Sequence, residues 1–210
     1  DTFYEFQRVV DTVCSDLDAG IHKTYLLRGV TGSGKTEVYM ELIAHTVAQG
    51  RQAIVLIPEI ALTYQTVMRF YNRFGDRVSI MNSKLSQGER FDQFERAKAG
   101  DIDIMIGPRS ALFTPFPHLG LIIIDEEHET SYKSETAPRY HARDVAIERA
   151  RMNDASVLLG SATPSVDSYY QAMQGKYQLL TLSERVEKKP LPDCEVVDLR
   201  SELRAGNRSI

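Results

Sequence analysis

Short apolar runs rich in β-branched residues alternate along the chain with longer stretches of helical periodicity. The apolar runs predict strands at residues 24–28, 52–57, 78–81, 102–106, 121–124, 157–159 and 177–182. The stretches between them predict helices at residues 35–49, 60–73, 86–99, 139–151 and 165–174, after a first helix that carries Cys14. Strands this apolar, alternating with helices, are typical of a mostly parallel sheet covered by helices on both faces. The sequence therefore predicts a three-layer α/β domain.

The composition is that of a globular protein and excludes several other classes. Hydrophobic residues make up 42% of the chain and charged residues 26%, which argues against disorder. No apolar run approaches the roughly 18 residues of a membrane span. The 2 cysteines are too few for a disulfide framework or a four-ligand zinc site, so we expect a reducing, cytoplasmic setting. The net charge of −4 excludes a polycationic arm but leaves room for a local DNA-binding groove.

The length of 210 residues fits one large domain or one domain with an appendage. We expect the domain to cover residues 1–182. Charges and prolines accumulate from residue 183 and predict a linker, and residues 195–199 have the pattern of an edge strand within an appendage of residues 183–210. Because the chain does not begin with Met, we expect it to be a piece of a longer protein.

A glycine-rich segment between the first predicted strand and the next helix has the pattern of a phosphate-binding loop. Residues 29–36 read Gly-Val-Thr-Gly-Ser-Gly-Lys-Thr, which matches G-x-x-x-x-G-K-[ST] in the strand–loop–helix context that this motif requires. The glycines let successive N–H groups face phosphate oxygens, and the helix N-terminus adds its dipole. The alternative is a glycine-rich turn that binds nothing. The predicted nucleotide-binding residues are Gly29, Thr31, Gly32, Ser33, Gly34, Lys35, Thr36 and Glu37, with Lys35 also catalytic.

The most apolar strand, residues 121–124, ends in the acidic run Asp125-Glu126-Glu127-His128. Carboxylates at the carboxyl edge of a parallel sheet lie where ligands bind in open α/β folds. We expect Asp125 and the Thr36 hydroxyl to hold Mg²⁺ with ATP, and Glu126 to activate the attacking water. His128 could sense the γ-phosphate or be a solvated loop residue. A solvated acidic strand end is the alternative for the whole run, and hard-cation chemistry fits it better than a transition-metal site.

Aromatic rings and cations interleave between residues 131 and 144. Rings stack on bases and cations meet phosphates in single-strand binding, so this pattern indicates a nucleic-acid surface. A loop whose tyrosines pack on the domain and whose arginines are solvated would show the same pattern. The residues concerned are Tyr132, Lys133, Arg139, Tyr140, His141 and Arg143.

A third segment, Gly160-Ser161-Ala162-Thr163-Pro164, follows another predicted strand. Together with the phosphate loop and the acidic run, it resembles motifs I, II and III of superfamily 2 helicases. Longer strings at residues 29–39, 57–63, 107–113 and 125–144 resemble the primosomal protein N-prime family, the replication-restart DNA helicases of bacteria. The resemblance covers about residues 5 to 200.

The resemblance implies a fold, an activity and partners. The fold would be the first of two RecA-like P-loop NTPase lobes, and the activity ATP-driven 3′-to-5′ translocation on DNA in primosome assembly and the restart of stalled forks. ATP and Mg²⁺ would be the cofactors, with zinc only in a cysteine-rich region outside this chain. The partners would be single-stranded and forked DNA, a second RecA-like lobe, other primosome proteins and the single-stranded-DNA-binding protein. The location would be cytoplasmic, with the bacterial nucleoid.

The resemblance also implies roles for individual residues. Gln7 stands where the family has a glutamine that senses adenine. The segments that line the single strand contain Pro58, Glu59, Thr63, Arg109 and Ser110, and the aromatic-rich loop that couples DNA contact to hydrolysis contains Tyr132, Lys133, Arg139, Tyr140 and His141. His128, Ser161 and Thr163 would link the nucleotide site to DNA.

Three other functions share part of these features: a P-loop kinase for small molecules, a double-stranded-DNA translocase or restriction-type motor, and a docking platform gated by nucleotide. No segment resembles a second-lobe motif that carries an arginine finger. Such a finger contributes about 10³–10⁵ in rate. We therefore expect the chain alone to bind nucleotide but to hydrolyse it very slowly and not to unwind DNA.

Overall fold

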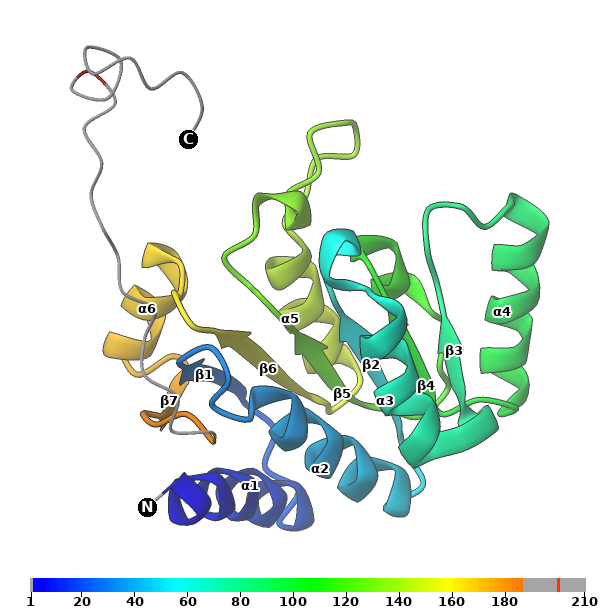
Figure 1. Ribbon diagram of the computed structural model, residues 1–210. Helices are drawn as coiled ribbons and strands as arrows, with labels where there is room; N and C mark the ends of the chain where they lie inside the picture. The colour runs from blue at the N-terminus through cyan, green and yellow to red at the C-terminus, as the bar shows by residue number, and fades with distance from the viewer. Residues whose placement is uncertain (1, 187–199, 201–210) are drawn as a thin grey trace.

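The computed structural model describes residues 2–186 and residue 200, and a seven-stranded sheet forms its centre (Figure 1). The strand order is β3-β4-β2-β5-β6-β1-β7, and every neighbouring pair is parallel. The strands are β1 (Thr24–Gly29), β2 (Gln52–Leu56), β3 (Val78–Ile80), β4 (Ile104–Gly107), β5 (Leu119–Ile124), β6 (Ser156–Ser161) and β7 (Gln178–Leu182). The predicted parallel sheet is confirmed. The predicted edge strand at residues 195–199, and Cys194, lie outside the described residues.

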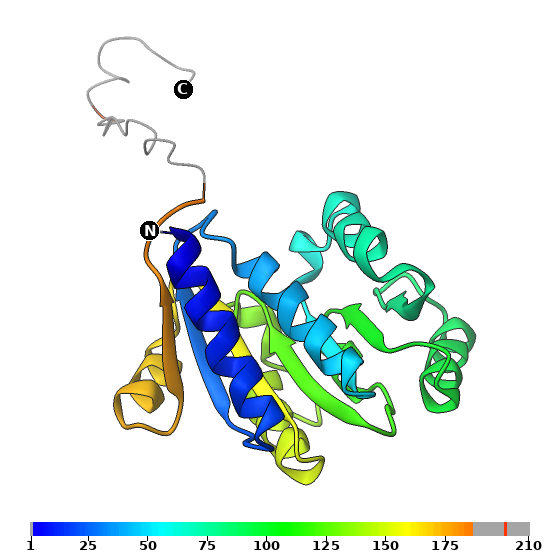
Figure 2. The same ribbon diagram turned by 90° about the horizontal axis from the view of Figure 1, so that it is seen from below.

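Helices cover both faces of the sheet, as predicted. Apolar side chains of α1 (Thr2–Asp18), α2 (Lys35–Ala48) and α3 (Tyr64–Phe74) pack against one face, and Figure 2 shows α1 and α2 lying across it. Those of α4 (Gln87–Ala99), α5 (Ala142–Met152) and α6 (Val166–Met173) pack against the other face. Within the part of the chain that the structure describes, no helix has the length and apolar character needed to cross a membrane.

Burial on both faces explains why the central strands lack polar alternation. In β5, Leu121 and Ile123 belong to the core under α2, whereas Ile122 and Ile124 belong to the core under α5. All residues of β2, β5 and β6 are buried. Since burial of one Leu or Ile side chain contributes about 1.5–3 kcal/mol, these strands hold both layers to the sheet.

Two predicted helices begin later than their patterns suggest. Helix α3 starts at Tyr64, because Thr63 caps it by accepting a hydrogen bond from the backbone N–H of Thr66 at 3.2 Å, and Glu59–Ala61 form a separate 3₁₀ helix. Helix α5 starts at Ala142, because the ring of His141 accepts from the backbone N–H of Arg143. The predicted starts at residues 60 and 139 are therefore wrong. Side chains that cap a first turn are preferred at helix starts.

The remaining boundaries differ from the predictions by at most two residues. Strand β5 begins two residues earlier than predicted and runs through Gly120. A Cβ atom at Gly120 would lie 3.0 Å from Cγ2 of Thr46 and from Cβ of Arg51. Glycine here permits close packing of α2 on the strand and does not mark the strand's start.

The strand order brings three chain segments to one place. Strands β5, β6 and β1 are successive neighbours and parallel, so their carboxyl ends share one edge of the sheet. The phosphate loop follows β1, the acidic run follows β5, and Ala162 and Thr163 follow β6. Loops that meet at this edge form the ligand sites of open α/β folds.

Candidate functional site

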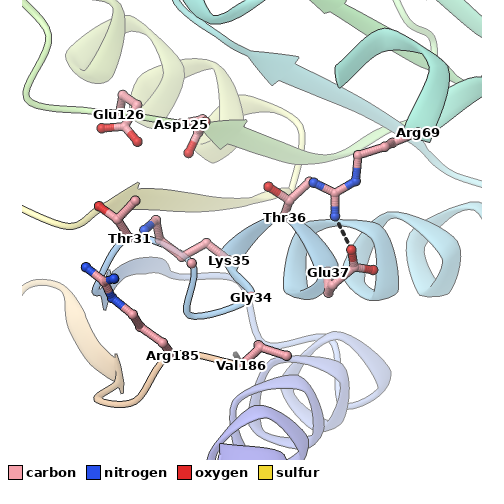
Figure 3. Close-up of a pocket in the computed structure, with 11 residues that line it drawn as sticks. Thr31, Gly34, Lys35, Thr36, Glu37, Arg69, Asp125, Glu126, Arg185 and Val186 are labelled. Atoms are coloured by element: carbon pink, nitrogen blue, oxygen red, sulfur yellow. Dashed lines mark hydrogen bonds and ion pairs between the residues drawn. The ribbon is translucent and has the colours of Figure 1, made fainter. Parts of the chain in front are cut away.

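A cavity of about 620 Å³ lies at the carboxyl ends of β1 and β5. Figure 3 shows the phosphate loop on one side of it and the acidic residues on the other. Its walls are formed by Thr31, Gly32, Gly34, Lys35, Thr36, Glu37, Arg69, Asp125, Glu126, Arg185 and Val186. The phosphate loop and the acidic run, which are about 90 positions apart in the chain, thus face one another across the cavity. A nucleotide site requires both of them in one place.

The backbone of the loop depends on its glycines. Gly32 and Gly34 have φ values of 78° and 91°, in the left-handed region that favours glycine. At Gly29 a Cβ atom would lie 2.5 Å from Oγ of Ser33 and 2.9 Å from Cγ of Lys35. The loop therefore needs glycine at all three positions to curl over the start of α2.

Lys35 closes the loop on itself. Its Nζ donates hydrogen bonds to the carbonyl oxygens of Gly29 at 2.6 Å and Val30 at 3.4 Å. Burial lowers the pKa of Lys35, and the nearby Glu126 and Asp125 carboxylates oppose that shift. An ammonium held at the mouth of a loop of N–H groups is placed to meet the β- and γ-phosphates of a nucleotide.

Asp125 is held by a residue that the motifs did not identify. The hydroxyl of Tyr39, a buried residue of α2, donates to Oδ1 of Asp125 at 2.7 Å. Burial raises the pKa of Asp125, and the hydrogen bond from Tyr39 and the charge of Lys35 oppose this. Tyr39 lies one turn after the phosphate loop, on the side of α2 that faces the sheet. A polar aromatic residue at that position was the one sequence feature that could have indicated a contact with Asp125.

Glu126 follows in an uncommon backbone conformation, with φ of 48°. A non-glycine residue in the left-handed region costs about 1–3 kcal/mol, and such positions cluster at functional sites. Burial and then the charge of Asp125 raise the pKa of Glu126, while His128 and Lys35 oppose the shift. A half-buried carboxylate with a raised pKa is a better base than an ordinary glutamate.

The donor set fits Mg²⁺ together with a nucleotide. No group of three or more His, Cys, Asp or Glu side chains within residues 2–186 is placed to hold a metal alone. Mg²⁺ is usually bound by one or two carboxylates together with substrate phosphates, and Thr36 and Asp125 supply hard oxygens on the same cavity. Oγ of Ser33 is buried with no hydrogen-bond partner, which leaves a donor of the loop free for a phosphate oxygen.

The structure brings the three predicted coupling residues together. Nδ1 of His128 lies 2.6 Å from Oγ of Ser161, and the backbone N–H of Thr163 donates to that same oxygen at 3.0 Å. Nε2 of His128 is 3.5 Å from a carboxylate oxygen of Glu126. The acidic run and the end of β6 are thus in direct contact beside the cavity.

A second link between these segments was not predicted. Glu127 is buried and accepts hydrogen bonds from the backbone N–H of Ser165 at 2.7 Å and from the hydroxyls of Ser165 at 3.1 Å and Ser168 at 2.8 Å. Arg143 at the start of α5 donates to the Ser168 hydroxyl at 3.2 Å. In the sequence, Glu127 stands among other acidic residues, and nothing in the pattern distinguishes the buried one.

A second cavity, of about 370 Å³, lies beside the segments that follow β2 and β4. Arg109 stacks on the ring of Tyr140 at 5.5 Å, and Phe113 meets the same ring edge-on at 5.6 Å. The cavity gathers segments from four parts of the chain, namely Pro58, Glu59, Ser83, Arg90, Pro108, Arg109, Ser110, Phe113, Ser131, Tyr132 and Tyr140. A half-buried cation and an aromatic ring in one groove are the components of a single-strand site. Ser83 and Arg90 lie outside the segments in which DNA-binding residues were predicted.

Some predicted DNA residues do not line this cavity, and Tyr132 lines it only as a buried side chain. Tyr132 is 1% exposed, and its hydroxyl donates to the backbone oxygens of Leu56 at 3.1 Å and Asp125 at 2.6 Å. Its ring therefore ties two strand ends together and offers no face for base stacking. Lys133 and Arg139 are exposed on the adjoining loop. His141 and Thr63 are the helix caps described above.

Gln7 lies apart from the nucleotide cavity. It is exposed on α1, where its side-chain amide donates to Asp11 at 2.7 Å. The first cavity contains no α1 residue, but it does contain Arg69, Arg185 and Val186, which the motifs did not identify.

Comparison with known proteins identifies relatives of the chain. The model of the DEAD/DEAH box helicase family matches residues 8–172. Replication restart protein PriA of Bacillus subtilis (strain 168) is 50% identical over 206 residues, which are 98% of this chain and 26% of that protein. The protein of the same name from Chlamydia pneumoniae is 49% identical, over 98% of this chain and 28% of its own length. The chain thus spans about a quarter of the length of these relatives, and the resemblance read from the motifs is confirmed.

Solved structures share the fold. RecG bound to a three-way DNA junction superposes with a TM-score of 0.63 at 24% identity, over 89% of this chain and 24% of that one. The Hef helicase domain of Pyrococcus furiosus gives 0.57 at 17% identity, over 85% of this chain and 38% of that one. At these identities the match bears on the fold alone, and it confirms the RecA-like architecture.

Proposed function

The chain belongs to the DEAD/DEAH box helicase family, and from that membership we propose that it is the ATP-binding lobe of a DNA helicase that acts in replication restart. The observation that carries the proposal is the shared cavity, in which Lys35 of the phosphate loop lies opposite Asp125 and Glu126. The name and the identity of the relatives support the restart role.

The residues of the cavity have distinct tasks in ATP binding and hydrolysis. Thr36 and Asp125 would hold Mg²⁺, which neutralises charge on the phosphate oxygens. Lys35 exchanges its loop carbonyls for the β- and γ-phosphates. Glu126 orients and deprotonates the attacking water, aided by its raised pKa. Tyr39 keeps the Asp125 carboxylate in place.

Titration calorimetry with ATP·Mg²⁺ tests the nucleotide site. Lys35→Ala should weaken binding about 10- to 150-fold, because a charge-assisted contact contributes about 1.5–3 kcal/mol. Lys98→Ala is the matched control, since Lys98 is exposed on α4 and pairs only with Glu95. Equal affinity of wild type and Lys35→Ala would show that the loop does not bind the nucleotide.

We propose that single-stranded DNA, including the single strand of a fork, crosses the second cavity. Arg109 and Tyr140 supply a cation and a ring there, and Pro58, Glu59 and Ser110 line the same groove. Lys133, Arg139 and His141 extend the surface along the adjoining loop, and Thr63 lies at the start of α3. Fluorescence anisotropy with a labelled oligonucleotide should show weaker binding by Tyr140→Ala, since a stacked base contributes about 1–3 kcal/mol. Tyr170→Ala is the control, because Tyr170 is an exposed tyrosine of α6 that does not line the groove.

The activity of the longer protein is a further part of the proposal. A second RecA-like lobe in the same polypeptide would complete the site, and 3′-to-5′ unwinding of forked DNA would follow. Other primosome proteins and the single-stranded-DNA-binding protein would be partners, in the bacterial cytoplasm with the nucleoid. Strand displacement from a fork by the full-length protein would support this reading. Displacement of a third strand from duplex DNA without unwinding would instead identify a double-stranded-DNA translocase.

A further inference from the structure

The four residues after β7, 183–186, form a strap across the phosphate loop. The backbone N–H of Val186 donates to the carbonyl of Gly32 at 3.0 Å. A Cβ atom at Gly34 would lie 3.3 Å from Cγ2 of Val186, so the strap packs directly on the loop. The strap continues from β7 at the edge of the sheet, as Figure 2 shows.

Helix α1 holds the other end of the strap. The backbone N–H and hydroxyl of Ser183 donate to the Glu5 carboxylate at 2.8 and 2.5 Å. The hydroxyl of Thr2 donates to Glu184 at 2.9 Å. The two hydrogen bonds from Ser183 lower the pKa of Glu5, which favours the charged carboxylate that accepts them. The strap is therefore fixed by α1 on one side of Arg185 and by the loop on the other.

Arg185 is the residue that the strap brings into the nucleotide cavity. It is half-buried and lines the same walls as Thr31 and Lys35. In Figure 3 its guanidinium points to the end of the cavity where Thr31 and the Lys35 ammonium lie. Among residues 2–186 it has no hydrogen bond and no ion pair with another side chain. Arg69, the other arginine of the cavity, is paired with Glu37 instead.

We propose that Arg185 binds the terminal phosphate of the bound nucleoside triphosphate, an inference that rests on the proposed function. A half-buried guanidinium with no partner in the described chain keeps its donors for an anion that enters the cavity. Guanidinium groups bind phosphate oxygens through two parallel hydrogen bonds. Because both ends of the strap are held, little freedom is lost when this contact forms. The Lys35 end of the cavity is the end for the β- and γ-phosphates, away from Glu37 and Arg69.

The test compares ATP·Mg²⁺ and ADP·Mg²⁺ affinities of the 210-residue chain by titration calorimetry. Arg185→Gln should weaken ATP binding about 10- to 100-fold, as expected for loss of a charged contact, and ADP binding less than about threefold. Arg185→Lys should retain part of the preference for ATP. Arg96→Gln, which removes the same charge from α4, should leave both affinities unchanged.

Two other outcomes would overturn the inference. Equal losses for ATP and ADP would show that Arg185 only supports the loop, and the absence of any loss would show that it does not contact the nucleotide. Glu184→Gln tests whether disturbing the strap is enough to weaken nucleotide binding, because Glu184 lies on the strap but outside the cavity. It should leave the preference for ATP over ADP unchanged. If Lys35→Ala weakens binding and Arg185→Gln does not, the inference fails and the nucleotide site stands. If the wild type binds neither nucleotide, the proposed function itself fails.

Discussion

At the scale of single residues, Gly160 and Tyr39 together set the position of Asp125. Tyr39 reaches across the carboxyl edge of the sheet to bond Asp125, and its ring passes over Gly160 of β6. A Cβ atom at Gly160 would lie 1.9 Å from the Tyr39 hydroxyl oxygen and 2.9 Å from Cζ. The glycine of the Gly-Ser-Ala-Thr segment is thus required by the tyrosine that holds Asp125.

Gly160→Ala should lower the free energy of unfolding by about 1–3 kcal/mol, the usual cost of an overpacked core. In the Tyr39→Phe background the same change should cost less, because the nearest clashing atom is gone. Urea denaturation followed by circular dichroism measures both. Gly88→Ala on α4 is the control and should be neutral or stabilising, because an added Cβ meets nothing closer than 4.0 Å there. Additive effects of the two substitutions would contradict the packing argument.

His141 gives the stability of the fold a dependence on pH. Burial and the charge of Arg143 lower the pKa of His141, whose ring must stay neutral at Nδ1 to accept the N–H that starts α5. A histidine whose folded pKa is lowered disfavours protonation in the folded state. Its stabilisation is therefore complete above the ordinary histidine pKa of about 6.5 and is lost as the pH falls from that value through the lower folded pKa.

His141→Asn should flatten the fall in stability between about pH 8 and pH 5, since asparagine caps helices without titrating. His141→Ala should also flatten it, but should be about 1 kcal/mol less stable than His141→Asn at every pH because the cap is lost. Thermal denaturation at several pH values distinguishes the two variants. Part of the slope should remain in both, because burial also lowers the pKa of His22. If stability depends on pH in both variants as it does in the wild type, His141 is not the cause of that dependence.

At the scale of elements, the sequence predicted each strand and each α-helix of the described chain, and it erred at the ends and missed the 3₁₀ helices. Apolar runs such as residues 121–124 identify buried strands, because burial on both faces leaves a strong local signal. The start of α3 depends on whether the Thr63 hydroxyl accepts a backbone N–H, and hydrophobic periodicity carries no information on that. Helix starts are therefore the least predictable part of the fold.

The site shows the same division between local and long-range signals. The phosphate loop, Asp125 and Glu126 were predicted because each motif is contiguous and its chemistry requires those residue types. Tyr39, Glu127 and Arg185 were not, because their roles arise only when distant segments meet. The Tyr132 ring, expected on the DNA surface, lies in the interior because its hydroxyl bonds two strand ends.

Helix α6 is positioned largely by one buried carboxylate. Glu127 accepts from the Ser165 cap and from Ser168 one turn later, so the acidic run holds the first turn of α6. Glu127→Gln should reduce the free energy of unfolding by about 1.5–3 kcal/mol, as expected for hydrogen bonds to a charged group. Hydrogen exchange should show that the amides of α6 lose protection first. Asp167→Asn on the exposed face of α6 is the control, expected within about 0.5 kcal/mol of wild type. Uniform loss of protection across the sheet would contradict a local role.

At the scale of the whole molecule, one edge of the sheet carries both cavities. The nucleotide cavity lies over the ends of β1 and β5, and the second cavity lies beside the segments that follow β2 and β4. Tyr132 contributes to the wall of the second cavity and bonds the backbone of Asp125 in the first. A shift of Asp125 on nucleotide binding therefore has a direct route to the proposed DNA groove.

The chain alone should bind ATP·Mg²⁺ yet turn it over at least about 10³-fold more slowly than a full-length relative, and it should not unwind DNA. The chain matches only 26% of the length of one such relative, and within residues 2–186 no second lobe closes over the phosphate loop. An arginine finger supplied across such a closure contributes about 10³–10⁵ in rate. Arg185 does not replace it, since a cation on the open lobe improves binding but does not exclude water. Phosphate release measured at saturating ATP, with and without single-stranded DNA, checks this expectation. DNA-stimulated turnover within about tenfold of the full-length relative would show that one lobe is sufficient, and would make Arg185 the first candidate for the missing charge.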